Sequence, residues 1–302
     1  MSSQIKIAIR GLSKFYGPTR GIEDLDLEIM SGEIFGFLGP NGAGKTTTIR
    51  CMMNILLPTK GEIWINETQV NRKNNDLRKK IGYIPEGLSL PENYSAKDFL
   101  SYIESMRGSP SPRREELVKR FDLPVKKKIS ELSRGNKQKV SVIAGFMHDP
   151  DVLILDEPTS GLDPLLQQEV YDLLLEAKQR GRTIFFSSHN LDEVQRICDR
   201  VGIVKDGVLV NVEDIDNLNK QVPRILEARL LKPDPDRLQS LGDHLLQTQE
   251  NDVRILIRQN DKISNFLEVL LPMEPEELAY PPASLEDYFM QFYKKKEKVG
   301  SN

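Results

Sequence analysis

The sequence predicts an α/β fold with an antiparallel β subdomain, a helical subdomain and a small α+β domain at its C-terminal end. Two observations carry this prediction. Short apolar strands alternate with helical patterns over most of the chain, which is typical of a parallel sheet. The pattern then changes after about Val222, and Pro223 begins a stretch of mixed strands and helices. We therefore expect one domain over residues 1–222 and a second over residues 223–302.

The first strands are recognised by alternation. IKIAI (5–9) and DLDLEI (24–29) alternate apolar and polar residues, which predicts half-buried strands of an antiparallel sheet. EIFGFLG (33–39) is more continuously apolar, ends in a glycine-rich turn and is followed by a predicted helix, TTTIRCMMNIL (46–56). Two more strands are expected, EIWI (62–65) and IGYIPE (81–86).

Helical periodicity dominates from about Ser95 to His148, which predicts a helical subdomain over about residues 87–150. Strand character returns further along, and a helix is expected between the first two of these strands. The predicted strands are VLILD (152–156), TIFFSS (183–188) and VGIVKDGVLV (201–210). The last domain contains RILEARL, VRILIR, an amphipathic ISNFLEVLL and a closing SLEDYFMQFY.

Composition excludes several classes of protein. The 302 residues include 42 Lys and Arg against 45 acids, a net charge of -3, so no global basic field for nucleic acid is expected. Two isolated cysteines favour a reducing compartment. The sequence MSSQIKIAIR is too polar for a signal peptide, and no apolar run approaches the roughly 18 residues of a membrane span. Any membrane role is therefore expected to act through a partner.

GPNGAGKT (39–46) matches the phosphate-loop pattern between a predicted strand and a predicted helix. Its glycines let the backbone curl until successive N–H groups point at phosphate oxygens. Lys45 supplies positive charge to the terminal phosphates, and the Thr46 hydroxyl is a ligand for magnesium. We assign nucleotide binding here to Gly39, Pro40, Asn41, Gly42, Ala43, Gly44, Lys45, Thr46 and Thr47.

Two further strand ends carry chemistry at the edge where open α/β sheets bind ligands. VLILDEP ends in Asp156, expected to hold magnesium, and Glu157, placed to polarise a water for attack on the terminal phosphate. SSH (187–189) puts His189 at the same edge, where it is expected to contact the γ-phosphate.

LSRGNKQK (132–139) raises a separate question, because Ser133 has the features of a helix N-cap and a helix N-terminus binds anions. Together these motifs resemble the nucleotide-binding subunit of an ATP-binding cassette (ABC) transporter, over about residues 5–220. That family carries a Ser-x-Gly-x-x-Gln signature, matched by Ser133, Gly135 and Gln138. The resemblance implies that this helix end grips the γ-phosphate of ATP held by a second subunit. It therefore implies a head-to-tail dimer with two composite ATP and Mg²⁺ sites.

The resemblance also implies roles for other positions. Tyr16 matches the aromatic residue that stacks on adenine, and Asp163 matches an aspartate at the contact between subunits. Glu86 replaces the family's glutamine that reports the nucleotide state to the membrane subunit, a change similar to that in single-cassette exporters of drugs and antibiotics. The glutamate keeps an oxygen that is expected to bind magnesium. Asn136 occupies a signature position where the broad pattern favours Gln. SLEDYF (284–289) resembles a closing motif of the same exporters, and KKKEK (294–298) is either a lipid-attracting or a solvated tail.

The resemblance implies an ATPase that drives a separate transmembrane permease, with export as the expected direction, from the cytoplasmic face of the membrane. Two alternatives remain. One is a soluble cassette ATPase acting on ribosomes or DNA. It is disfavoured because the chain has a single cassette and no excess of basic over acidic residues. The other is a regulatory cassette that binds ATP without useful hydrolysis, disfavoured by the intact hydrolytic set of Lys45, Asp156, Glu157 and His189.

Overall fold

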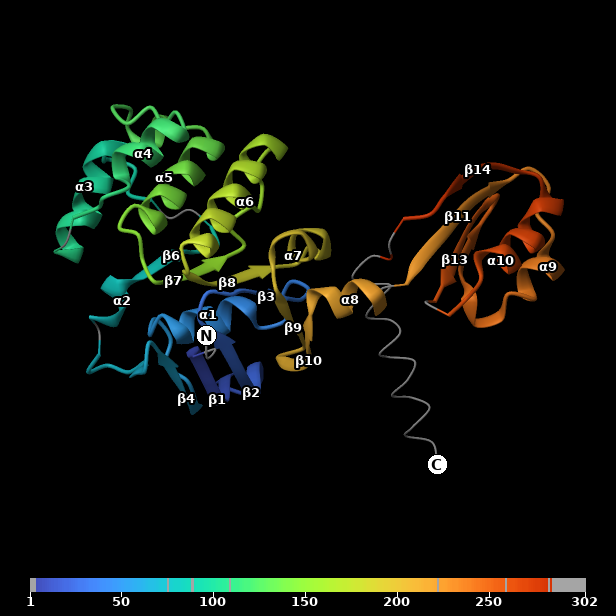
Figure 1. Ribbon diagram of the computed structural model, residues 1–302, viewed down its shortest axis with the longest axis horizontal. Coiled ribbons are helices and arrows are strands. Elements are labelled where there is room, and N and C mark those ends of the chain that lie inside the picture. The colour runs from blue at the N-terminus through green and yellow to red at the C-terminus, as the bar shows by residue number, and fades with distance from the viewer. Residues whose placement is uncertain are drawn as a thin grey trace. The chain divides into compact units, whose positions relative to one another are not determined.

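The chain forms two compact units in the computed structural model, Met1–Ile215 and Asp216–Asn302 (Figure 1). The structure describes residues 4–74, 76–87, 90–108, 110–221, 223–258, 260–281 and 283. The division falls at the start of helix α8 (Ile215–Gln221), ahead of the boundary expected at Pro223. SLEDYF (284–289) and KKKEK (294–298) lie outside the described residues. No helix in the described ranges is long and apolar enough to cross a bilayer.

The first unit begins with an antiparallel sheet in the strand order β2-β1-β4-β5. The two strands expected from alternation are confirmed within longer ones, which pair antiparallel with Ile7 opposite Ile29. Their alternate residues are buried, because one face of this sheet is packed in the core. The strands are β1 (Ile5–Tyr16), β2 (Thr19–Met30), β4 (Lys60–Ile65) and β5 (Thr68–Gln69).

The second sheet has the order β10-β9-β3-β8-β7-β6, and only β10 runs antiparallel to its neighbour. The predicted parallel sheet is thus confirmed. Every residue of β3, β7 and β8 is buried, which explains why these strands read as continuous apolar runs. The strands are β3 (Ile34–Leu38), β6 (Ile81–Ile84), β7 (Val152–Asp156), β8 (Thr183–Ser188), β9 (Arg200–Lys205) and β10 (Val208–Asp214).

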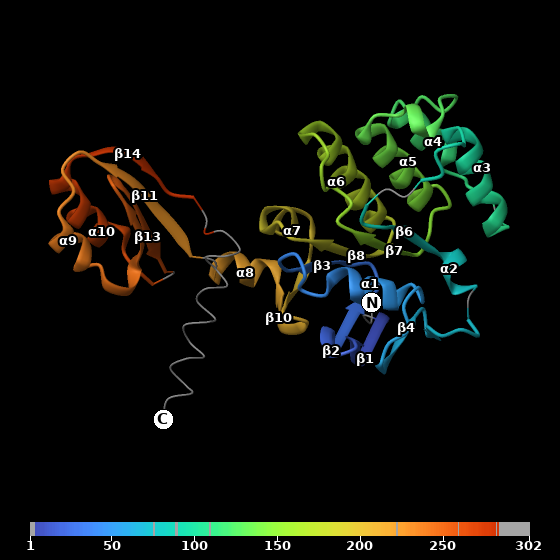
Figure 2. The same cartoon turned by 180° about the vertical axis from the view of Figure 1, so that it is seen from behind.

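Helices cover this sheet on both sides (Figures 1 and 2). Helix α1 (Lys45–Met52) packs between the two sheets and shares their core. Helices α6 (Pro164–Gln179) and α7 (Leu191–Ile197) lie on the opposite side. The short helix α2 (Leu77–Lys80) precedes the helical region. That region contains α3 (Ala96–Arg107), α4 (Arg114–Arg120), the 3-10 turn Ile129–Glu131 and α5 (Arg134–Phe146).

Some local expectations were wrong. The helix after the glycine-rich turn ends at Met52 rather than continuing to residue 56, and Asn54 takes a left-handed φ of 51° that breaks it. VGIVKDGVLV forms a hairpin rather than one strand, because Asp206 and Gly207 both adopt positive φ, at 46° and 78°, as a tight two-residue turn requires.

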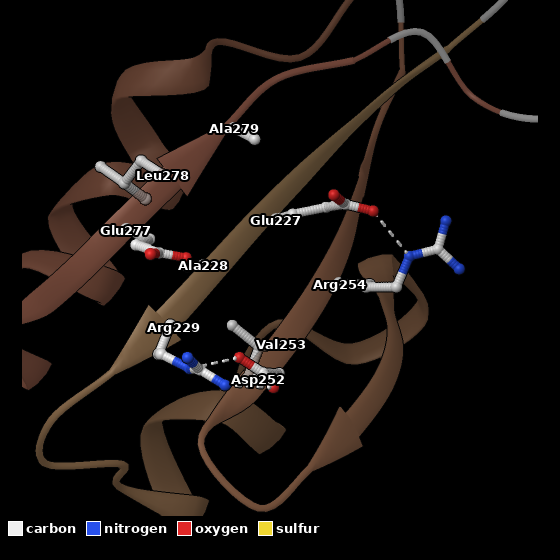
Figure 3. A pocket seen from close by; sticks show the side chains of 9 residues that line it. All are labelled: Glu227, Ala228, Arg229, Asp252, Val253, Arg254, Glu277, Leu278 and Ala279. Carbon is white, nitrogen blue, oxygen red and sulfur yellow. Dashed lines mark hydrogen bonds and ion pairs between the residues drawn. The ribbon is translucent and has the colours of Figure 1, made fainter.

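The second unit is an antiparallel sheet, β12-β13-β11-β14, with α9 (Pro235–Gln239) and α10 (Ile263–Leu270) packed on one face. The other face carries cross-strand ion pairs (Figure 3). Arg254 pairs with Glu227 at 3.0 Å and Arg229 with Asp252 at 3.1 Å, and both pairs are partly exposed. The strands are β11 (Arg224–Leu230), β12 (Leu245–Gln249), β13 (Asp252–Ile257) and β14 (Pro275–Ala279), with 3-10 turns at Gly242–His244 and Leu271–Met273.

Candidate functional site

The phosphate loop leaves β3 and enters α1, as its sequence predicts. Gly42 and Gly44 have φ of 81° and 104°, a region that side chains with a Cβ rarely adopt. Space is restrictive as well: a Cβ on Gly39 would lie 2.3 Å from the Val204 carbonyl oxygen, and one on Gly44 would lie 2.4 Å from that of Gly21. The glycines are therefore required by conformation and by packing.

Lys45, the first residue of α1, lies at the centre of this loop and is only 5% exposed. Its Nζ donates to the carbonyl oxygens of Gly39 at 2.7 Å and Pro40 at 3.1 Å. It also forms an ion pair with Oε1 of Glu157 at 3.1 Å. A buried ammonium with these three acceptors is held in one place inside the loop.

Asp156 ends β7 and is fully buried. Oδ1 accepts a hydrogen bond from the Ser187 hydroxyl at 2.8 Å, whereas Oδ2 has no hydrogen-bond partner within the described chain. The nearby Thr46 hydroxyl carries a single hydrogen, which it donates to Oε2 of Glu86 at 2.9 Å. Burial raises the pKa of Asp156, and the charges of Glu86 and Glu157 raise it further.

These groups fit a hard divalent cation that binds chiefly to phosphate and water. The described residues contain no cluster of three or more His, Cys, Asp or Glu side chains arranged as a complete metal site. Magnesium in nucleotide sites uses one or two protein ligands besides phosphates and waters. The unpartnered buried oxygen of Asp156, with the Thr46 hydroxyl and the Glu86 carboxylate beside it, matches that requirement.

Glu157 follows Asp156 at the edge of the sheet and has a left-handed φ of 46°. Its backbone N–H donates to the Ser187 hydroxyl at 3.1 Å. Nδ1 of His189 lies 2.8 Å from Oε2 of Glu157, while the opposite oxygen faces Lys45. The carboxylate of Glu157, only 7% exposed, is thus held from two sides, whereas the His189 side chain is 52% exposed.

One hollow joins most of the predicted nucleotide-binding residues to this acidic edge. Tyr16 lies at its rim, 47% exposed, with its hydroxyl 3.4 Å from that of Thr47. The hollow is lined by Tyr16, Thr19, Arg20, Gly21, Asn41, Gly42, Gly44, Lys45, Thr46, Thr47, Glu86 and Glu157. His189 instead lines an adjoining hollow, which it shares with Glu157 and Ser160. The structure therefore groups a ring, a phosphate loop and two acids around one space.

The signature residues do not line that hollow. Ser133 is the N-cap of α5, accepting from the Asn136 N–H at 3.3 Å, and Asp163 is the N-cap of α6, accepting from Leu166 N–H at 3.0 Å. Both are exposed, and a Cβ on Gly135 would meet only Leu166, at 4.0 Å. Open space around three residues at two helix N-termini leaves them free to contact another molecule.

Two connections at the site were not predicted from the sequence. Ser187 forms hydrogen bonds with both Asp156 and the backbone of Glu157. This contact could have been found from the strand register, because the pairing of β7 with β8 places Ser187 opposite Asp156. Gln138 is buried and donates to the Pro158 carbonyl at 2.7 Å, which ties α5 to the loop after Glu157. No local pattern indicates the second contact.

A phosphate loop, an acidic strand end and a histidine on one sheet edge define a site for hydrolysing a nucleoside triphosphate. Comparison with known proteins gives the family. Residues 22–160 match the family model described as ABC transporter. The ABC transporter ATP-binding protein YhaQ of Bacillus subtilis is 33% identical over 98% of this chain and 99% of its own length. The bacitracin transport ATP-binding protein BcrA of Bacillus licheniformis is 36% identical over 76% of each chain.

Solved structures agree. An ATP-binding subunit of an ABC transporter superposes with a TM-score of 0.66 at 29% identity, over 71% of this chain and 92% of the other. The ADP- and phosphate-bound cassette MJ0796 gives 0.64 at 22% identity, over 69% and 98%, which shows the shared fold. The chain belongs to the ATP-binding subunits of ABC transporters, the ATPase cassettes that drive transport.

Proposed function

We propose that this chain hydrolyses MgATP at the edge of β7 and β8 and so powers a separate permease, in the direction of export. The observation that carries the hydrolytic part is the arrangement of Glu157. One oxygen of its buried carboxylate faces Lys45 and the other faces His189, and the residue before it, Asp156, has an unpartnered buried oxygen. A base so placed can take a proton from a water that attacks a phosphate held by the loop.

Each residue has a separate task in this proposal. The loop N–H groups and Lys45 bind the β- and γ-phosphates, and the Tyr16 ring stacks on adenine. Thr46, Asp156 and Glu86 would hold Mg²⁺, which when bound neutralises phosphate charge. Glu157 accepts the proton from the water. His189 orients Glu157. Because it lies at the same edge of the sheet as Glu157, it can also contact the γ-phosphate.

The second nucleotide contact is proposed to come from another copy of the chain. Ser133, Gly135 and Asp163 are accessible at helix N-termini and lie outside the hollow that contains Lys45. A helix N-terminus attracts anions, so these residues suit the γ-phosphate of ATP bound to a partner cassette. Two chains arranged head to tail would form two such sites, without a role for nucleic acid.

The names of the relatives support a task in drug transport, and we infer export by a chain attached to the cytoplasmic face of the membrane. BcrA proteins of Bacillus licheniformis and Enterococcus faecalis are named for bacitracin transport, and YbhF of Escherichia coli is named a probable multidrug transporter protein. Glu86 in place of the usual glutamine is a second point of similarity with single-cassette exporters. The permease would then supply both the membrane attachment and the choice of cargo.

Calorimetry and phosphate release with a Lys45→Ala variant test the ATP site. We expect ATP affinity to fall at least about tenfold, because a buried charge on the terminal phosphates is removed. Lys60→Ala, at an exposed lysine of β4, is the matched control and should bind ATP normally. Unchanged ATP affinity in Lys45→Ala would refute the assignment.

The membrane partner is tested by isolating a tagged chain from detergent-solubilised membranes of its own cell. A protein with several membrane spans should accompany it in a fixed ratio. Deleting the gene for that protein should release the chain from the membrane fraction. If the chain stays in the membrane fraction after the deletion, or no such protein accompanies it, the permease proposal is wrong.

A further inference from the structure

Glu193, on α7, accepts hydrogen bonds from three hydroxyl groups. Oε1 accepts from Thr159 at 2.8 Å and from Tyr171 at 2.9 Å, and Oε2 accepts from Ser188 at 2.6 Å. Thr159 is two residues past Glu157, Tyr171 is on α6, and Ser188 directly precedes His189. One carboxylate therefore connects the two catalytic segments to each other and to a helix.

The three donors are almost inaccessible, with Thr159 and Ser188 each 2% exposed and Tyr171 5% exposed. Water cannot replace a lost partner easily in such a place, so each hydroxyl depends on the carboxylate. Burial and the charge of Glu193 both raise the pKa of Tyr171, as expected for a phenol that donates to an anion. A carboxylate suits the position because it accepts at both oxygens, whereas an amide accepts at only one.

The link to His189 runs through Ser188. Its hydroxyl donates to Glu193 and accepts from the Asn190 backbone N–H at 2.9 Å, so the residues on both sides of His189 are held. The His189 side chain is 52% exposed, and packing alone does not fix it. Its contact of 2.8 Å with Glu157 therefore depends on where the backbone places the ring.

The link to the other segment runs through Thr159. Its carbonyl accepts from the Leu162 N–H at 3.2 Å, which closes the turn that leads to Asp163. The Thr159 side chain is bonded to Glu193 while its backbone shapes this turn. A shift of Glu193 would thus move the segment after Glu157 relative to His189.

We propose that Glu193 is a positioning residue for ATP hydrolysis, which holds His189 and the loop after Glu157 in the geometry that their contact requires. It lines the hollow that also contains Glu157 and His189, and in this proposal it acts through its hydrogen bonds to Ser188 and Thr159. This inference rests on the proposed roles of Glu157 and His189. Turnover by the unaltered chain shows separately whether the chain hydrolyses MgATP, and turnover by Glu157→Gln, measured in parallel, reports on the role of Glu157.

The test compares Glu193→Ala and Glu193→Gln with Asp192→Asn, a matched control at the exposed neighbouring acid on α7. We expect kcat for MgATP to fall at least about tenfold in Glu193→Ala and less in Glu193→Gln, since misplaced catalytic groups lose rate steeply. KM and ATP affinity should stay within about twofold, because no residue of the phosphate loop is touched. Asp192→Asn should match the unaltered chain.

A spectroscopic measurement separates positioning from general damage to the fold. The chain has only three histidines, so the ring nitrogens of His189 can be assigned by NMR through its variant. At fixed pH these signals should move in Glu193→Ala, while those of His148 and His244 stay. Unmoved His189 signals, or a kcat equal to that of the control, would overturn the proposal.

Ser188→Ala supplies a second route if Glu193→Ala does not fold, because it removes one donor and leaves the charge in place. It should reproduce part of the kcat loss and the His189 shift. In the double variant Ser188→Ala with Glu193→Gln, the losses should be smaller than the product of the two single losses, as for residues acting in one chain of contacts. Fully multiplicative losses would show that Glu193 does not act through Ser188.

Discussion

Nζ of Lys45 and Oε1 of Glu157 lie 3.1 Å apart, and both side chains are nearly buried. The lysine that we propose to bind phosphate is thus paired with the carboxylate that we propose as the base. In the proposed site, bound phosphates would share the charge of Lys45 and weaken its attraction for Glu157, whose other oxygen contacts His189. We therefore expect nucleotide binding to loosen the contact between Lys45 and the proposed base, Glu157.

Glu157→Gln is expected to lower ATP turnover at least about a hundredfold, because an amide has no useful basicity toward water. ATP affinity should be kept or slightly raised, since Lys45 loses a competing negative charge. Phosphate release and calorimetry measure the two effects. Glu115→Gln, at an exposed acid of α4, should show neither. Turnover within about threefold of the unaltered chain would remove Glu157 from the role of base.

Glu86→Gln tests the magnesium site. The Thr46 hydroxyl donates to the Glu86 carboxylate at 2.9 Å, so this acid lies beside the expected cation. Removing its charge should shrink the ratio between ATP affinity with Mg²⁺ and ATP affinity with EDTA severalfold, because Coulomb attraction to the cation is lost. Glu131→Gln, at an exposed acid near α5, should leave the ratio unchanged. A ratio unaffected by Glu86→Gln would place the metal elsewhere.

His148 makes stability depend on pH. Burial, together with the charge of Arg107, whose NH1 lies 2.5 Å from Nε2, lowers its pKa to about 4. Well above pH 6.5 the ring is neutral in both the folded and the unfolded chain. Between pH 6.5 and pH 4 His148 is protonated in the unfolded chain but not in the folded chain. The free energy of unfolding therefore falls as pH falls through this window.

At pH 5 the loss from His148 alone should be on the order of 2 kcal/mol relative to pH 7.5. His148→Gln keeps an acceptor for Arg107 but removes the titrating group. Urea unfolding at the two pH values should therefore show a smaller loss of stability for the variant than for the unaltered chain. Equal losses would mean that the folded chain accommodates a protonated His148.

The sequence predicted those parts of the site that depend on local order. Gly42 and Gly44 adopt positive φ next to a strand, and the glycines of the loop sequence predict such a turn. Asp156 and Glu157 end an apolar run, so their edge follows from the strand pattern. The helix after the loop was predicted too long, because the left-handed turn at Asn54 leaves no trace in apolar periodicity.

The contacts between segments could not be predicted in the same way. Gln138 and Pro158 meet because α5 packs beside the end of β7, and Glu193 meets Ser188 and Thr159 only after α7 folds back. The charged face of the second unit, with Arg254 on Glu227, depends on strand register, which the alternation of each strand alone does not fix. Such contacts require the tertiary fold.

The signature helix gives the final prediction, that Ser133 serves a nucleotide bound to another copy of the chain. Ser133→Arg adds bulk at the exposed N-terminus of α5, outside the hollow that holds Lys45. ATP affinity of the monomer should stay near that of the unaltered chain, while turnover falls and an ATP-dependent dimer, followed by size-exclusion chromatography, does not form.

Loss of a helix cap has to be separated from loss of the interface, because Ser133 also accepts from the Asn136 N–H. Replacing an N-cap costs about 1 kcal/mol. Ser95→Arg is the matched control, since Ser95 caps α3 in the same way, accepting from the Asp98 N–H at 3.1 Å. That variant should lose a similar stability and still form the ATP-dependent dimer. If it fails to dimerise as well, the cap rather than the interface explains Ser133→Arg.

The decisive measurement mixes Ser133→Arg with Lys45→Ala protein. In a head-to-tail mixed dimer, one composite site carries both substitutions and the other carries neither, so turnover should return at the intact site. Each variant alone should stay inactive at the same total concentration. If Ser133→Arg instead weakens ATP binding to the monomer as much as Lys45→Ala does, the two residues contact the same nucleotide within one chain. The head-to-tail dimer would then be wrong, and Ser133 would belong to the site of its own Lys45.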